Sequence, residues 1–269
     1  MKRLLKMLPS LLRVGFAENI AYRAEMLIWV LATTMPFVMM VLWRSVAEHF
    51  PIVGGMGQTL GPLQMTHYFL AVFVVRQVVS AWAAWEMNFE IRQGTLSMRL
   101  LKPLSPLISY AVNGLTGLPL RLVVALPVLL IFFLLGGLRD GAEYRLFFLL
   151  PLALLGGWLI VLFAHMSIGS LAVFTGSSIR IMEVWMAAFF VFSGYLFPLD
   201  LFPDWLASIG DVLPFRYQLG FPVQLLTLSL RMEDALILLG KQWLWVVALG
   251  SLTGLLWRKG VRRFEAFGG

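Results

Sequence analysis

Few residues of this chain have the types and the spacing that catalysis requires. Asp200 and Asp204 are four positions apart, so one face of a helix would carry both carboxylates, as an acid and base pair needs. Acidic residues in a first turn also stabilise the helix dipole, and Pro203 suits the first position of a helix, which explains both aspartates without chemistry. The three histidines fit no His-Glu-x-x-His motif, and no serine lies in a Gly-x-Ser-x-Gly turn. We therefore expect no catalytic site in this chain.

The motifs of nucleotide and metal binding are also missing. Gly240 and Lys241 lack the upstream glycine and the following hydroxyl residue of a Gly-x-x-x-x-Gly-Lys-[Ser/Thr] phosphate loop. The chain has no cysteine, which excludes a disulfide framework and a cysteine-based metal site. We expect no cofactor and no metal in this chain.

Polar side chains inside long apolar stretches are the best candidates for a binding pathway, because in a bilayer such groups usually face protein or water. Arg76 could contact an anionic or amphipathic substrate, or it could pair with Glu183 or bond backbone carbonyls in a structural role. We expect structural roles for Arg121, which can snorkel to the membrane surface, and for His165, which can bridge helices. The candidate pathway residues are Arg76, Gln77, Glu183 and Ser193.

The apolar stretches themselves dominate the composition. Hydrophobic residues make up 60% of the 269 residues and the mean hydropathy is +0.85, which exceeds what a soluble core needs. At about 20 apolar residues per span, the sequence predicts an all-α membrane protein with six transmembrane helices. They run near Met26–Trp43, Leu63–Trp85, Leu107–Leu138, Leu146–Thr175, Ile181–Leu199 and Ile237–Trp257.

The distribution of positive charge predicts the orientation. Six spans put both termini on one side, and the segments on that side hold thirteen of the 21 Lys and Arg residues, against six on the other side. We expect both termini in the cytoplasm, and the inner membrane of a bacterium is the expected location. The net charge of +7 then reflects topology and lipid headgroups, so we expect membrane lipids rather than nucleic acid as partners.

Residues 1–25 form an amphipathic pattern ahead of the first span. Five leucines would lie on one side of a helix, with Lys2, Lys6 and Arg13 opposite, and Pro9 would kink or restart it. We expect an interfacial elbow helix here; a frayed basic tail is the alternative. The five leucines are Leu4, Leu5, Leu8, Leu11 and Leu12.

Residues 86–106, between the second and third spans, have mixed charge and end in two prolines. Leu96 and Leu100 indicate a short helix across the membrane surface, with Gly94 and Pro103 as its hinges. Such a helix could transmit force from a soluble partner. The alternative is a solvated loop with capping charges.

Residues 198–226, between the fifth and sixth spans, combine prolines and aromatic residues with an amphipathic pattern. Leu201, Trp205 and Ile209 would form its apolar face. Irregular backbone is tolerated at membrane depth only where protein or water covers it, so we expect a re-entrant hairpin on the outer side.

The order of these elements resembles the permease subunit of ABC-2 type exporters. The resemblance covers essentially the whole chain, 1–269, as a single transmembrane domain with a cytoplasmic tail at 258–269. The motif that carries the resemblance is Glu90-Ile-Arg92-Gln-Gly94-Thr-Leu96 followed by Leu101-Lys102-Pro103.

The resemblance implies roles for the two loops. Phe89–Lys102 would be the coupling helix that sits in a groove of a separate ATPase subunit, and the hairpin would close the exit of the pathway. The expected coupling residues are Phe89, Glu90, Arg92, Gly94, Leu96, Leu100, Lys102 and Pro103. The expected outer-gate residues are Tyr195, Pro198, Asp200, Pro203, Trp205 and Pro214.

The same resemblance implies partners. Six spans would be half of a pathway, so two permeases, identical or similar, would assemble with ATPase subunits that bind ATP and Mg. The expected function is export of a hydrophobic or amphipathic substrate. A secondary transporter or channel, and a membrane assembly subunit without transport activity, stay as alternatives.

Overall fold

The computed structural model describes residues 33–50, 52–53, 59–137, 144–227 and 229–264, with a few isolated positions near the N-terminus. The predicted elbow, residues 1–25, and the predicted start of the first span therefore lie outside the continuously described residues. The predicted tail is described only as far as Phe264.

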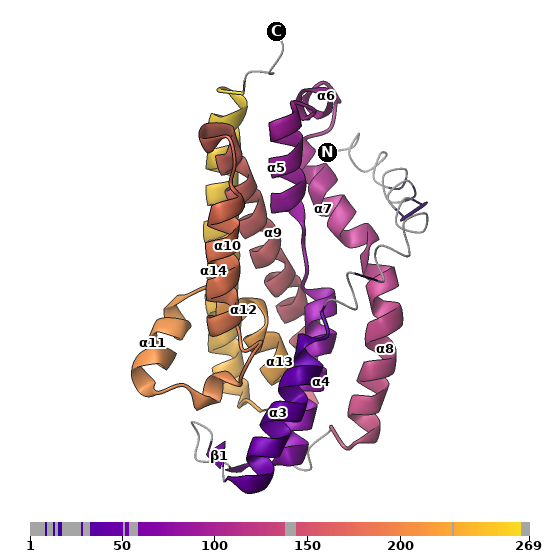
Figure 1. Cartoon of the computed structure of the whole chain (residues 1–269), viewed down its shortest axis with the longest axis vertical. Helices are drawn as coiled ribbons and strands as arrows, with labels where there is room; N and C mark the ends of the chain where they lie inside the picture. Colours follow the sequence, from indigo (N-terminus) through magenta and orange to yellow (C-terminus); the bar gives the residue numbers. More distant parts are fainter. Residues whose placement is uncertain are drawn as a thin grey trace.

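Helices make up nearly all the regular structure of this part of the chain, and most of them run along one long axis (Figure 1). Two strands of two residues each, β1 (Ile52–Val53) and β2 (Thr59–Leu60), pair antiparallel after the first helix. The long helices are α3 (Met35–His49), α4 (Pro62–Val78), α5 (Ala83–Gln93), α7 (Pro106–Thr116), α8 (Leu118–Leu134), α9 (Leu150–Thr175), α10 (Ile179–Phe192) and α14 (Met232–Val261). The short ones are α6 (Leu96–Leu100), η1 (Tyr144–Phe148), η2 (Leu199–Leu201), α11 (Asp204–Val212), α12 (Phe215–Gln218) and α13 (Gly220–Leu226).

Four helical stretches of the described chain are long and apolar enough to cross a membrane. They are Pro62–Arg92, Pro106–Leu134, Leu150–Thr175 and Met232–Val261. α3 has 15 residues and α10 has 14. At about 1.5 Å per residue, each is shorter than a hydrocarbon core of about 30 Å. The chain is thus a multi-pass membrane protein, and six spans stay a prediction.

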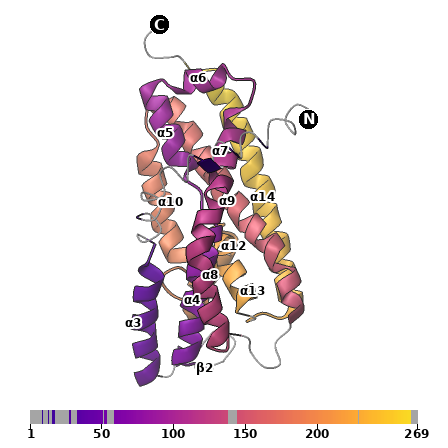
Figure 2. The ribbon, with the colours of Figure 1, turned by 90° about the vertical axis from the view of Figure 1, so that its right-hand side faces the viewer.

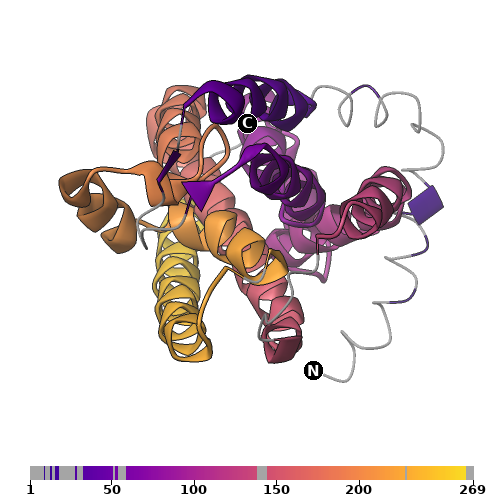
Figure 3. The same cartoon turned by 90° about the horizontal axis from the view of Figure 1, so that it is seen from below.

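α9 is the central helix of the bundle. α9 packs along α14 and α5, and it also contacts the short helices α12 and α13. Most of its middle is buried, including Trp158, His165 and Ser170. Figure 2 shows α9 between α10 and α14, and Figure 3 shows α8 on one side of the bundle and α11 projecting on the other.

The second and third spans are broken, although the sequence predicts continuous helices there. The second breaks between α4 and α5, at 79–82, and the third breaks at Gly117, just before Pro119. Proline has no N–H to donate and its ring crowds the preceding turn, which accounts for the break near Gly117. The second helix also continues to Gln93, beyond the predicted end at Trp85, so the first eight residues of the predicted loop at 86–106 belong to α5.

The two ends of the bundle differ. α6 and the C-terminal end of α14 lie at one end, whereas β1 and the turn after α8 lie at the opposite end (Figure 1). We call these the α6 end and the β1 end. η2, α11, α12 and α13, residues 199–226, lie beside the half of the bundle nearer the β1 end (Figure 1).

Gly157 of α9 allows the closest backbone approach in the core. A Cβ there would lie 2.6 Å from the carbonyl oxygen of Gln218, a backbone atom that cannot rotate away. We expect Gly157→Ala to lower the free energy of unfolding by about 2 kcal/mol, because α12 must move away from α9. Gly240, where an added Cβ meets nothing within 4 Å, is the matched control. Denaturant titration in micelles should show Gly240→Ala to be neutral or stabilising.

Candidate functional site

α5 carries charged residues out of the apolar bundle at the α6 end. α4 has 17 residues and α5 has 11, together about 42 Å of helix, which exceeds a hydrocarbon core of about 30 Å. α5 ends at Gly94, whose φ of 72° lies in the left-handed region that favours glycine. α6 begins two residues later, so the chain turns sharply between the two helices.

One arginine of α6 joins two carboxylates of α5. Arg99 Nη2 lies 2.8 Å from Glu86 Oε1 and 2.6 Å from Glu90 Oε1. Tyr110 of α7 donates its hydroxyl to Glu90 Oε2 at 2.6 Å, and Asn113 of α7 donates to Glu86 Oε1 at 2.9 Å. The Arg99 guanidinium also lies over the Tyr110 ring, 4.8 Å from its centre. We call these five residues the Arg99 cluster.

The Arg99 cluster fixes α6 relative to α5 and α7. Burial alone would lower the pKa of Arg99, but the Glu86 and Glu90 carboxylates raise it above its ordinary value, so the guanidinium stays charged. Charge-assisted bonds of this kind are about twice as strong as neutral ones. The cluster therefore links α6 to both α5 and α7.

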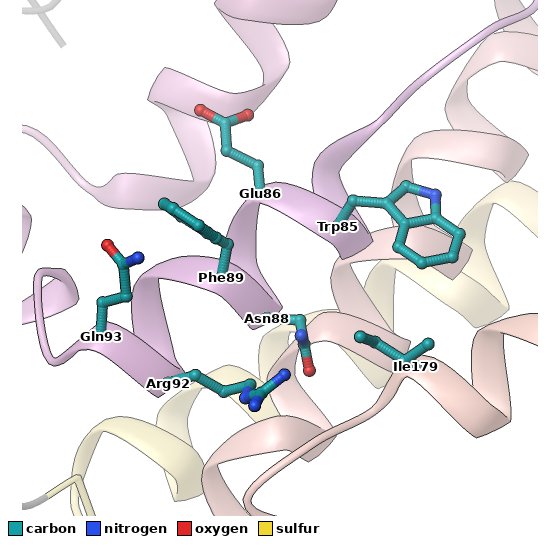
Figure 4. Close-up of a pocket in the computed structure, with 7 residues that line it drawn as sticks. All are labelled: Trp85, Glu86, Asn88, Phe89, Arg92, Gln93 and Ile179. Atoms are coloured by element: carbon teal, nitrogen blue, oxygen red, sulfur yellow. The ribbon is translucent and has the colours of Figure 1, made fainter.

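A groove opens beside the cluster, between α5 and the start of α10 (Figure 4). Its volume is about 750 Å³, and six of its lining residues come from α5. Phe89 is 60% exposed there, and Arg92 and Gln93 are also exposed. The lining residues are Trp85, Glu86, Asn88, Phe89, Arg92, Gln93 and Ile179; we call this the α5–α10 groove.

A buried hydrogen bond joins α5 to the start of α10. Asn88 Oδ1 accepts from the backbone N–H of Ser178 at 2.9 Å, and Ser178 is the residue that begins α10. Gly176, with φ of 72°, ends α9 just before it. A movement of α5 would therefore shift the beginning of α10.

α10 leads from the groove to the segment 193–226 and packs on it through aromatic rings. The ring centres of Trp185 and Phe215 are 4.6 Å apart, and those of Phe189 and Tyr195 are 5.8 Å apart. The turn at Gly194 is fixed from outside, because Tyr68 donates its hydroxyl to the Gly194 carbonyl at 2.7 Å. α10 thus connects the groove at the α6 end with the segment 193–226 nearer the β1 end, which we call the proline-rich segment.

Comparison with known protein families decides what kind of molecule carries this arrangement. The model of the ABC-2 family transporter proteins matches residues 31–268. The chain belongs to that family. No curated protein matches it.

Membership gives this permease a role in membrane transport as part of an ABC system. Permeases of the ABC-2 family are generally non-catalytic membrane components, and ATP is hydrolysed by separate subunits with which they associate. Among the described residues, no group of three or more His, Asp or Glu is placed to hold a metal ion.

The predicted coupling residues of the permease face different ways. Phe89 and Arg92 line the groove, and Lys102 and Pro103 are exposed beyond α6. Glu90 and Leu96 are buried, and Leu100 is half-buried, so these three face the bundle and not an outside partner. Gly94 supplies the turn.

The predicted outer-gate residues lie along the segment that follows α10. Tyr195, Pro198 and Pro214 are buried, whereas Pro203 and Trp205 are exposed, Trp205 by 66%. Asp200 is half-buried in η2 and accepts a hydrogen bond from Gln224 Nε2 at 3.4 Å. Asp204 begins α11, so Asp200 and Asp204 do not share one helix.

In the described part of the chain, no hydrogen bond or ion pair joins the four predicted pathway residues to one another. Arg76 does not pair with Glu183; it donates to the Val79 carbonyl at 3.1 Å and lies over the Phe189 ring. Glu183 is on the exposed face of α10. The two remaining members are buried and bonded: Gln77 donates to Thr33 Oγ1 at 2.8 Å, and Ser193 Oγ accepts from the Tyr195 N–H at 3.2 Å.

Arg121 does not snorkel, which corrects the expectation from the sequence. Its side chain is 7% exposed and donates to the carbonyls of Gly114 at 2.6 Å, Gly117 at 3.3 Å and Ser80 at 3.4 Å. Arg76 and Arg121 thus donate to carbonyls at the breaks in both spans. Broken membrane helices need such donors, because no water is present to replace the lost backbone bonds. His165, by contrast, has no partner for its buried Nδ1 among the described residues.

Proposed function

We propose that this chain is the permease subunit of an ATP-driven exporter and that its α6 end docks on the ATPase subunit. The observation that carries the proposal is the combination of an exposed groove with a rigid support. Phe89, Arg92 and Gln93 offer an aromatic, a cationic and an amide group to a partner. Directly beside them, the Arg99 cluster holds α6 against α5 and α7.

The proposed coupling begins with ATP and Mg bound by the ATPase. Closure of the ATPase subunits pushes α6 and the groove, and the Arg99 cluster passes this movement to α5. The Asn88 to Ser178 bond passes it to α10, whose other end packs on the proline-rich segment. That segment then opens the exit of the pathway, which makes the β1 end the outer side.

Charge supports this orientation. Arg92, Arg99 and Lys102 lie at or beside α6, and the end of α14 carries Arg258 and Lys259 at the same end of the bundle (Figure 1). Basic residues concentrate on the cytoplasmic side of membrane proteins. We place both termini in the cytoplasm and the chain in the inner membrane of a bacterium.

A second permease completes the proposed pathway. α8 and α14 have apolar faces that the described residues leave uncovered. Only 22% of the most apolar stretch of Pro106–Leu134 is buried, and 28% of that of Met232–Val261. Lipid and a second permease, identical or similar, are the proposed occupants. The cargo would be hydrophobic or amphipathic, because the exposed residues of α8 are all apolar.

Reversing one charge in the groove tests the docking. We expect Arg92→Glu to reduce the ATPase subunit that co-purifies with the tagged permease from its native membrane by about tenfold, since a like charge then faces the partner. Mass spectrometry identifies the subunit, and an ATPase assay on the complex quantifies it. Arg258→Glu, an exposed arginine at the same end but outside the groove, should change the yield less than about twofold.

Two outcomes would count against the proposal. An ATPase subunit that co-purifies equally with Arg92→Glu would exclude the groove as the docking site. A permease that carries no ATPase in several mild detergents would favour a secondary transporter or an assembly subunit. Equal amounts of each variant in the membrane show that insertion is intact.

A further inference from the structure

A small cavity near the β1 end, with polar and apolar lining residues, lies apart from the α5–α10 groove. Its volume is about 190 Å³, and it is enclosed by the first turns of α4, the turn after α8, η2 and the end of α13. Sites for drug-sized ligands usually measure about 300–1,000 Å³, so this cavity suits a small group. Its lining residues are Leu60, Leu63, Gln64, His67, Tyr68, Gly136, Gly137, Pro198, Asp200, Gln224, Thr227 and Ser229; we call it the Asp200 cavity.

Asp200 and Gln224 have acceptor capacity to spare in the Asp200 cavity. Among the described residues, the Asp200 carboxylate accepts one hydrogen bond, the long one from Gln224 Nε2 at 3.4 Å. Gln224 is 6% exposed, and its Oε1 has no donor among the described residues. The Thr227 hydroxyl lies within donating distance of the Val223 carbonyl at 3.0 Å, Ser229 Oγ at 3.2 Å and the Gln224 carbonyl at 3.4 Å. Ser229 Oγ donates to the Gln224 carbonyl, and the Tyr68 hydroxyl donates to the Gly194 carbonyl.

The charged residues of the described lining also favour a cationic ligand. The described lining contains one carboxylate and no lysine or arginine. The cation that acts on Asp200 from outside the lining is Arg216, which is already paired with Asp211. A buried acceptor with no donor is costly, so a ligand that donates hydrogen bonds and carries positive charge would relieve both deficits.

We propose that the Asp200 cavity binds the primary ammonium group of a small ligand. An ammonium has three donors and no acceptor, which matches a lining with spare acceptors, and its carbon chain would lie against Leu60, Leu63 and Pro198. One carboxylate is too few for a divalent cation, which prefers several oxygen ligands. The site is independent of ATPase docking, so it can be tested on the permease alone.

The test is binding of butylammonium to the full-length permease in lipid nanodiscs, measured by saturation-transfer NMR. Butanol has the same chain without the charge, and tetramethylammonium has the charge without N–H donors. We expect butylammonium to bind at least about tenfold more tightly than either, because a charge-assisted hydrogen bond is lost in both. Equal binding of butanol or tetramethylammonium would overturn the proposal.

Substitutions at Asp200 and Asp204 test whether butylammonium binds in the Asp200 cavity. We expect Asp200→Asn to weaken butylammonium binding by about tenfold or more. Asp204→Asn, which removes an exposed carboxylate outside the cavity, should leave it unchanged. Unchanged binding to Asp200→Asn would overturn the assignment, and if that variant does not fold, the three ligands on the natural chain decide. Nanodiscs with and without phosphatidylethanolamine distinguish a lipid amine, which would compete with butylammonium, from a soluble one.

Discussion

Replacing Arg99 with glutamine is expected to lower the free energy of unfolding by about 2 kcal/mol and to uncouple the ATPase from the permease. The change removes the cation that faces Glu86 and Glu90, which are four residues apart on one face of α5. Losing one partner of a largely buried ion pair leaves the other charge unpaired, which costs more than the pair contributes. Here two carboxylates lose their cationic partner at once, and α6 loses its ion pairs with α5.

Two further variants separate this mechanism from a general loss of packing. Arg99→Lys keeps the charge but not the planar donor group, so it should recover part of the stability. Adding Glu90→Gln to Arg99→Gln removes one stranded carboxylate and should be less damaging than the two single effects combined. SDS titration in micelles measures unfolding, and ATPase activity of the complex measures coupling. A loss below about 0.5 kcal/mol would mean that the cluster does not hold α6.

Replacing Arg121 with leucine should lower the free energy of unfolding by about 3 kcal/mol. Removing a charge from the membrane interior relieves about 3 kcal/mol. Three charge-assisted hydrogen bonds are lost in exchange, at about 2 kcal/mol each. The carbonyls of Gly114, Gly117 and Ser80 lose that donor at two helix breaks, where no water can replace it.

The control for Arg121→Leu is Arg145→Leu, which removes an exposed arginine from η1. It should change stability by no more than about 0.5 kcal/mol. Both are measured by SDS titration against the natural chain. An Arg121→Leu permease as stable as the natural one, or more stable, would show that burying the charge costs more than its bonds return.

The fold class and the main helices follow from the apolar stretches, which have the right length and spacing. The helix breaks at 79–82 and at Gly117 do not follow, because hydropathy is as high across a broken helix as across a continuous one. Pro119 accounts for the second break, because proline has no N–H to continue the helix across Gly117. The first has no proline, and it is stabilised by Arg121 from another helix, 41 positions away.

The short helix near 96–100 was predicted in its position, but the packing of its neighbours was not. Gly94 and the leucines placed a short helix near 96–100, because a left-handed turn favours glycine. Glu90 looked like a contact residue, yet it binds Arg99 and Tyr110 inside the bundle. Which face of α5 is exposed depends on how α7 packs, and no local pattern fixes that.

Site-specific cross-linking tests the central claim, that the α6 end docks on an ATPase. The chain has no cysteine, so single cysteines can be introduced at Phe89, at Met98 of α6, and at Phe148 of η1; these are 60%, 68% and 86% exposed. Each is labelled with benzophenone maleimide in native membrane vesicles and irradiated, and the adducts are identified by mass spectrometry. We expect Phe89→Cys and Met98→Cys to give an adduct with an ATP-binding subunit and Phe148→Cys to give none. Adducts with that subunit from Phe148→Cys alone, or none from either position at the α6 end, would contradict the account.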